Sequence, residues 1–99
     1  MQIVLEPEAL SDLQAAYDWY ESQLDGLGED FIEAIDAAIA LIRRMPELYP
    51  VIYRDSRRVI LNRFQYQILF VVGNQEVSIF ALMHTRRDPK SWQTRRDES

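Results

Sequence analysis

Hydrophobic residues in the first half of the chain recur at intervals of three and four, the spacing of one helix face. One such stripe consists of Leu10, Leu13, Tyr17, Tyr20 and Leu24. A second stripe consists of Phe31, Ile35, Ala38, Ile39 and Ile42. Gly26 and Gly28 lie between the stripes and Pro46 follows the second, so the pattern predicts two helices joined by a short turn. We expect an antiparallel helical hairpin over about residues 7–45.

Two signals compete for the start of the first helix. Pro7 suits the first helical position, where its missing N–H has no cost. Ser11 with Gln14 would instead form a capping box and place the start later. We favour Pro7, and the short apolar run at residues 3–5 before it predicts a strand.

Beyond Pro50 the hydrophobic period becomes alternating or continuous, which is typical of strands. Residues 57–63 alternate in part, and the runs 66–72 and 77–83 are strongly apolar. Gly73-Asn74 separates these two runs as a hairpin turn does, which makes this part of the sheet antiparallel.

Together the elements predict one α+β domain spanning residues 1–99, in the order β-α-α-β-β-β. The helical hairpin packs on a mainly antiparallel sheet of about three to four strands over about residues 52–84. A short basic tail follows over residues 85–99, in which Ser91 caps a helix that extends through Arg95.

The two longest strands are apolar on both faces, and the helical hairpin can cover only one of them. A partner chain would cover part of the second face in one interpretation. In the other, the loop at residues 46–56 and the C-terminal tail fold over it.

Charge divides the chain at the end of the second predicted helix. Residues 1–42 hold ten Asp and Glu and no Lys or Arg, whereas residues 43–99 hold eleven Lys and Arg against six acids. The net charge of −5 therefore conceals a local cationic surface, and local surfaces select partners. The acidic total argues against binding of nucleic acid by the whole surface.

The rest of the composition mainly excludes certain classes of protein and of site. The chain has no Cys, which excludes a disulfide framework and thiol catalysis and suits a reducing cytoplasm. Its first eight residues lack the pattern of a signal peptide, and no apolar run approaches the roughly 18 residues that span a membrane. The acidic helix positions are typical of a solvated face, so no metal site and no cofactor are expected.

Cations and aromatic residues follow the last predicted strand, in a loop where binding sites are common. Arginine and tryptophan are frequent anchors of protein interfaces. We therefore expect one docking surface for a macromolecular target, made by Arg86, Arg87, Lys90 and Trp92 with Arg57 and Arg58. Trp19 is one position off the inward stripe, which leaves it available to a partner.

Ribonuclease chemistry is the catalytic alternative. It needs an acid or base and cations around the phosphate, roles open to His84 with Arg63 and Arg86. His84 is the only histidine of an acidic chain, so we favour a protein that binds over an enzyme. A triad of Ser78, His84 and Asp88 lacks the nucleophile elbow that would support it.

The order and spacing of several short segments resemble the RelE/ParE superfamily of type II toxin–antitoxin toxins, most closely its ParE branch. The resemblance covers nearly the whole chain. It rests on Ala9, Asp12-Leu13, Tyr17-Asp18-Trp19-Tyr20, Gly26-Leu27-Gly28, Phe31, Pro46, Tyr49-Pro50, Arg57-Arg58-Val59, Arg63-Phe64-Gln65-Tyr66, His84, Arg86-Arg87-Asp88-Pro89 and Trp92. The family often has Pro where this chain has Gln65.

The resemblance implies the same fold and a small cytoplasmic toxin that a cognate antitoxin neutralises. A ParE-like member would bind DNA gyrase, a RelE-like member would cleave mRNA on the ribosome, and a degenerate member would only bind its antitoxin. We expect the antitoxin to contact Trp19, Tyr20, Phe80 and Leu82, and operator DNA to be bound only through the antitoxin.

Overall fold

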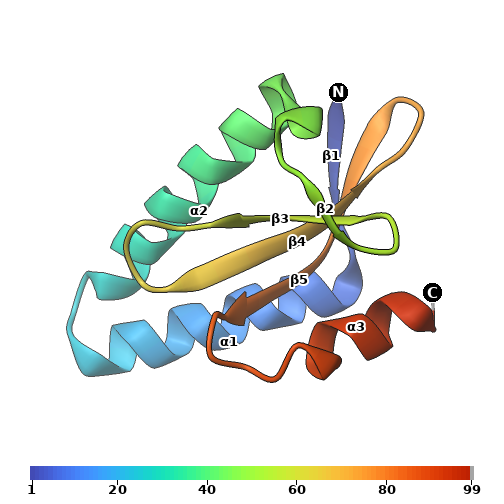
Figure 1. The fold of residues 1–99 in the computed structure, drawn as a ribbon. Coiled ribbons are helices and arrows are strands. Elements are labelled where there is room, and N and C mark those ends of the chain that lie inside the picture. The colour runs from blue at the N-terminus through green and yellow to red at the C-terminus, as the bar shows by residue number, and fades with distance from the viewer. Residues whose placement is uncertain (99) are drawn as a thin grey trace.

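The structure of the protein is a computed structural model that describes residues 1–98. Three helices, one short 3-10 segment and five strands follow one another along these residues (Figure 1). In chain order they are β1 (Gln2–Leu5), α1 (Pro7–Gln23), α2 (Leu27–Arg44), η1 (Pro46–Leu48), β2 (Val51–Tyr53), β3 (Ser56–Ile60), β4 (Tyr66–Val72), β5 (Glu76–His84) and α3 (Lys90–Asp97).

The five strands form one mixed sheet in the order β1-β5-β4-β3-β2. β1 pairs in parallel with β5, and the other neighbouring strands pair antiparallel. The α+β prediction is confirmed, but the sheet has more strands than expected. The additional strand, β2, covers only three residues, too few for a periodic pattern to reveal.

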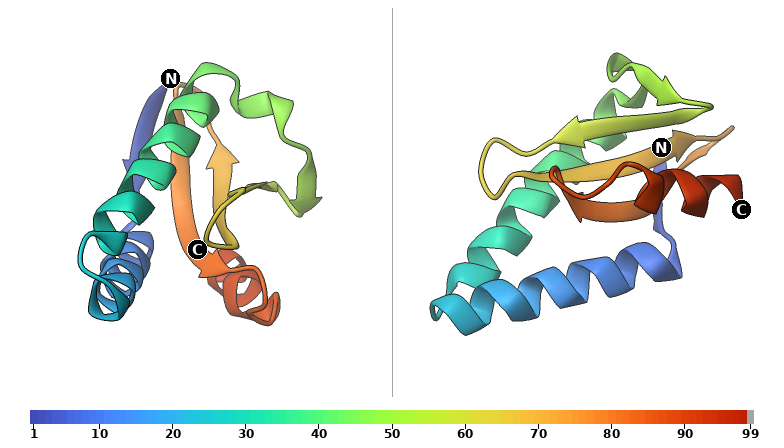
Figure 2. Two further views of the ribbon diagram at one scale, coloured as in Figure 1. Left: turned by 90° about the vertical axis from the view of Figure 1, so that its left-hand side faces the viewer. Right: turned by 60° about the horizontal axis from the view of Figure 1, so that its bottom comes forward.

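The predicted helical hairpin forms and covers one face of the sheet, where α1 and α2 pack on the strands (Figure 2). In α2 the buried side chains are Phe31, Ile35, Ala38 and Ile42, as the spacing predicted. In α1 the helix begins at Pro7 as expected, but its buried residues are Ala9 and Ala16, whereas Leu10 and Leu24 are exposed. Ala9 and Ala16 share the core cluster with residues of β5, and the larger stripe residues Leu13 and Tyr20 are partly buried beside it.

The second face of the sheet carries the C-terminal tail, as one of the two interpretations of the sequence expected. α3 lies on the side of the sheet opposite the hairpin (Figure 2). Its Trp92 packs in a separate cluster with Leu69, Phe80, Ala81 and Met83, which Tyr53 and Val71 border. Pro89, and not Ser91, occupies the N-cap position of α3. The last tail residue, Ser99, lies outside the described residues.

The turn between β3 and β4 places two consecutive non-glycine residues in the left-handed region. Phe64 has φ of 77° and Gln65 has φ of 55°. The ring of Phe64 reaches the aromatic rings of Tyr20 and Phe31, which holds the turn in this conformation. Proline fixes φ near −65°, so the Pro often found at this position in the resembling family cannot adopt the geometry of Gln65.

Candidate functional site

A groove lies between α1 and the end of β5, where the pairing of β5 with β1 has ended. The β1–β5 register stops at Leu5 and Ile79, so β5 continues beyond its parallel neighbour. The groove has a volume of about 260 Å³. Its lining includes Asp12, Ala15 and Trp19 from α1, Tyr66 and His84 from the strands, and Arg87 from the loop. It brings an aromatic, an imidazole and a guanidinium together.

Exposed Trp19 is the outer member of a connected aromatic cluster. Its side chain is 59% exposed, and its ring meets the ring of Tyr20 edge-on at 5.1 Å. Tyr20 in turn contacts Phe64 and Tyr66, at 4.9 and 6.0 Å between ring centroids. The cluster therefore supports a large exposed indole on a rigid base, as interface anchors require.

His84 closes the strand beside this cluster. Its ring lies 5.6 Å from the ring of Tyr66, and its Nδ1 accepts the backbone N–H of Arg86 at 3.1 Å. In a neutral ring that hydrogen bond places the proton on Nε2. The backbone N–H of Thr85 donates to the carbonyl of Gln65 at 2.8 Å, which ties the strand end to the β3–β4 turn.

Tyr66 is electrostatically coupled to both sides of the groove. Burial raises the pKa of its hydroxyl, and the carboxylate of Asp12 raises it further, whereas the cation of Arg87 lowers it. Tyr66 therefore stays neutral at physiological pH and can donate or accept a hydrogen bond.

The cations of the predicted docking surface separate into different environments. Arg86, Arg87 and Lys90 are exposed together in the loop after β5 and at the start of α3. Arg57 instead donates to the carbonyl of Tyr49 at 2.6 Å. Arg58 lies on the opposite face of the same strand and donates to Gln67 Oε1 at 3.4 Å.

Trp92 contradicts its predicted role as an exposed anchor. Its side chain is only 3% exposed, because it fills the cluster between α3 and the second face of the sheet. The physical reason is that this face is apolar and needs a cover, and Trp92 is the buried residue of α3. Trp19, expected to serve the antitoxin, is the tryptophan that lies beside Arg87.

The three residues considered for ribonuclease chemistry are not all in the groove. Arg63 lies over the ring of Phe64, 4.6 Å from its centroid, and pairs with Asp30 at 3.5 Å. Arg86 contacts His84 through its backbone N–H. Arg87, rather than Arg63 or Arg86, lines the groove with His84.

The residues expected to contact an antitoxin differ in exposure. Trp19 is exposed, and Tyr20 is half-buried with its hydroxyl donating to the carbonyl of Phe64 at 3.2 Å. Leu82 and Phe80 are buried, although Leu82 lines the groove and Phe80 borders a second hollow of about 340 Å³ beside the start of α1. Of these four residues, Trp19 is therefore the one most accessible to an antitoxin.

Sequence reasoning missed one polar connection beside the groove. The Asp12 carboxylate accepts the backbone N–H of Leu82 at 3.0 Å and a guanidinium N–H of Arg95 at 2.6 Å. The link joins residues 83 positions apart, so no local signal in the sequence could have revealed it. Within residues 1–98, no group of three or more His, Cys, Asp or Glu side chains could hold a metal ion.

The fold is a small α+β domain of the RelE/ParE type, with a helical hairpin on a mixed sheet. A family model described as "ParE toxin of type II toxin-antitoxin system, parDE" matches residues 3–89. The chain therefore belongs to the ParE toxin family. A search of curated protein sequences finds no match to this chain.

Solved structures of toxin–antitoxin systems share this fold. The chromosomal ParDE system from P. aeruginosa aligns with a TM-score of 0.63 at 22% identity, over 85% of this chain and 95% of that chain. The intact E. coli RelBE complex aligns with a TM-score of 0.65 at 14% identity, over 87% and 98%. The isolated E. coli RelE toxin aligns with a TM-score of 0.63 at 13% identity, over 99% and 98%.

Over residues 1–98 no helix is both long and apolar enough to cross a bilayer.

Proposed function

We propose that this chain is a cytoplasmic ParE-type toxin that inhibits growth by binding DNA gyrase, and that a cognate antitoxin neutralises it. The observation that carries the proposal is the exposed group of Arg86, Arg87 and Lys90 on a chain that is acidic overall. The net charge of −5 disfavours docking into a ribosomal site walled by phosphate, so we assign the local cationic patch to a protein target. Membership of the ParE family supports the choice of gyrase.

The test measures DNA supercoiling by gyrase with purified chain added. We expect the unaltered chain to block supercoiling, and a variant with Arg86, Arg87 and Lys90 changed to Ala to need about tenfold more protein or greater. The matched control changes Arg43 and Arg44 to Ala, two exposed cations at the end of α2. Absence of inhibition by the unaltered chain would overturn the proposal. Equal weakening of inhibition in both variants would show that Arg86, Arg87 and Lys90 do not form the gyrase-binding surface.

Ribosome-dependent cleavage of mRNA is the second candidate, because the groove holds Tyr66, His84 and Arg87 together. Transcript cuts that occur only during translation, and that disappear in His84→Ala, would favour it. Neither gyrase inhibition nor cleavage, combined with tight antitoxin binding, would favour a non-toxic member of the family.

For the antitoxin, the exposed indole of Trp19 beside the groove is the proposed anchor. Trp19→Ala should weaken the toxin–antitoxin complex by about tenfold or more, measured by calorimetric titration. Operator DNA should bind the toxin only through the antitoxin. Binding by the isolated toxin in a gel-shift assay would contradict this part of the proposal.

A further inference from the structure

The helix α3 is attached to the rest of the molecule by one apolar residue and a set of charged contacts. Trp92 is the buried residue among Lys90–Asp97. Its ring meets the ring of Tyr53 edge-on, with 5.7 Å between centroids. Arg95, Arg96 and Asp97 of α3 make polar contacts with the rest of the chain, whereas α1 and α2 pack mainly through apolar side chains.

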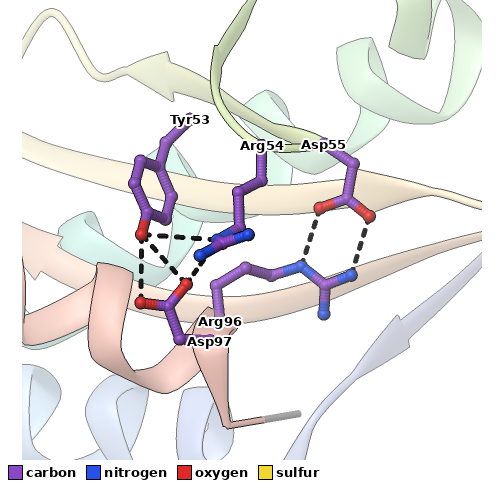
Figure 3. A network of polar contacts seen from close by, with 5 residues as sticks. All are labelled: Tyr53, Arg54, Asp55, Arg96 and Asp97. Carbon is purple, nitrogen blue, oxygen red and sulfur yellow. Dashed lines mark hydrogen bonds and ion pairs between the residues drawn. The ribbon is translucent and has the colours of Figure 1, made fainter.

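The C-terminal end of α3 is held by a polar network with the turn between β2 and β3 (Figure 3). Asp97 accepts the hydroxyl of Tyr53 at 2.9 Å and pairs with Arg54 at 2.5 Å. Arg96 donates two hydrogen bonds to the Asp55 carboxylate, at 2.8 and 2.7 Å. The Arg96 guanidinium holds the pKa of Asp55 below its usual value. These pairs lie near solvent, where each is weak and sensitive to salt.

Arg95 makes the more protected contact on the other side of α3. It pairs with Asp12 at 2.6 Å and with Glu8 at 2.9 Å, and it donates to the carbonyl of Phe80 at 3.1 Å. The Arg95 and Asp12 side chains are each 18% exposed. α3 is therefore fastened to α1 and β5 as well as to the β2–β3 turn.

The main core does not depend on α3. The cluster between the helical hairpin and the sheet draws its buried residues from the chain before α3, whereas Trp92 belongs to the second cluster. An eight-residue helix is unstable alone in water, so its turns should persist only while the helix is docked. Loss of the fastening contacts would therefore release the whole of α3 and leave the hairpin and sheet folded.

We propose that α3 is a detachable strap, which opens as one unit in the folded protein and uncovers the apolar second face of the sheet. Opening exposes Leu69, Ala81 and Met83, which are buried beneath it. Because the network in Figure 3 consists of exposed charge pairs, ionic strength adjusts how often the strap opens.

The experiment is native-state hydrogen exchange, which detects rare openings and distinguishes local opening from global unfolding. We expect the amides of residues 93–97 to have similar protection factors against hydrogen exchange, well below the protection factors of the β4 amides. Asp55→Asn should lower the protection in α3 by about two- to fivefold, and added NaCl should lower it in the unaltered chain. The matched control Asp36→Asn, on the exposed face of α2, should leave α3 unchanged.

A charge exchange, Asp55→Arg with Arg96→Asp, should restore much of the lost protection. The strap proposal is overturned if α3 and β4 exchange through the same opening, or if Asp55→Asn lowers the protection of both equally. It is also overturned if protection within α3 declines gradually toward the end of the chain, because that result describes fraying rather than release of a unit.

Discussion

The Asp12 carboxylate and the Arg95 guanidinium together take the place of a neighbouring strand along β5. Where β1 has ended, Asp12 accepts the N–H of Leu82 at 3.0 Å and Arg95 donates to the carbonyl of Phe80 at 3.1 Å. The two side chains are joined to each other at 2.6 Å. Backbone groups that would lack a partner at the open edge are thereby satisfied, and α1, β5 and α3 are joined at one point.

Asp12→Ala should lower the free energy of unfolding by about 2–4 kcal/mol, because it leaves the backbone N–H of Leu82 without its acceptor and removes the more buried of the two carboxylates that pair with the Arg95 guanidinium. Urea denaturation monitored by circular dichroism measures the change. Glu33→Ala, at an exposed position of α2, is the control and should change stability by about 0.5 kcal/mol or less. A loss for Asp12→Ala no larger than that of the control would show that water replaces the carboxylate fully.

The two tryptophans should behave oppositely. Trp92→Ala should lower the free energy of unfolding by about 2–3 kcal/mol. The loss cannot exceed the contribution that docking of α3 makes to stability. Trp19→Ala should change the free energy of unfolding by about 0.5 kcal/mol or less, since Trp19 is mainly exposed. Urea denaturation of both variants measures the difference.

Fluorescence provides an independent check on the same pair. With Trp19→Phe the remaining Trp92 should emit at shorter wavelength than Trp19 does in the Trp92→Phe variant, because a buried indole is shielded from water. Emission at long wavelength from Trp92 would contradict its placement between α3 and the sheet.

Periodicity predicted the architecture because burial follows spacing, as in α2, where Phe31 and Ile35 are buried as expected. Periodicity failed where side-chain size or a tertiary contact decided which residues are buried. In α1 the alanines face β5 and Leu10 is exposed, since close approach of helix and strand favours small side chains. Spacing alone could not show that Trp92 covers an apolar face, because this depends on how a distant segment folds back.

The candidate site shows the same limit. The exposed loop cations Arg86 and Arg87 could be predicted, since they follow a strand end. Arg57 could not be separated from Arg58 by composition, yet the alternation of β3 places them on opposite faces. The link between Asp12 and Arg95 joins residues 83 positions apart, and no local pattern in the sequence reports such a contact.

The β3–β4 turn should respond in opposite ways to two changes at Gln65. Its φ of 55° lies in the left-handed region, which costs a non-glycine residue free energy. Gln65→Gly should therefore raise the free energy of unfolding by about 0.5–1 kcal/mol. Gln65→Pro should lower it by about 3 kcal/mol or more, because proline cannot reach positive φ. Thermal unfolding of both variants checks the pair, and a stable proline variant would show that the turn takes another conformation.

Stability at alkaline pH should depend on Tyr66. Burial and the nearby Asp12 raise the pKa of its hydroxyl in the folded chain above the ordinary value of about 10. The folded state thus holds the phenolic proton more tightly than the unfolded state does. The resulting stabilisation is complete below about pH 10 and is lost as pH rises through the folded pKa. Tyr66→Phe removes this titration, so its free energy of unfolding should fall less steeply above about pH 10 than that of the unaltered chain.

Tyr17→Phe is the matched control for this measurement, although the pKa of Tyr17 is also raised. Its hydroxyl donates to Glu29 at 3.2 Å in an exposed hydrogen bond, and burial is the first cause of the raised pKa only at Tyr66. Because charge in contact with water is screened, Tyr17→Phe should alter the alkaline slope less than Tyr66→Phe does. Equal slopes in the two variants would show that the burial of Tyr66 does not govern its titration.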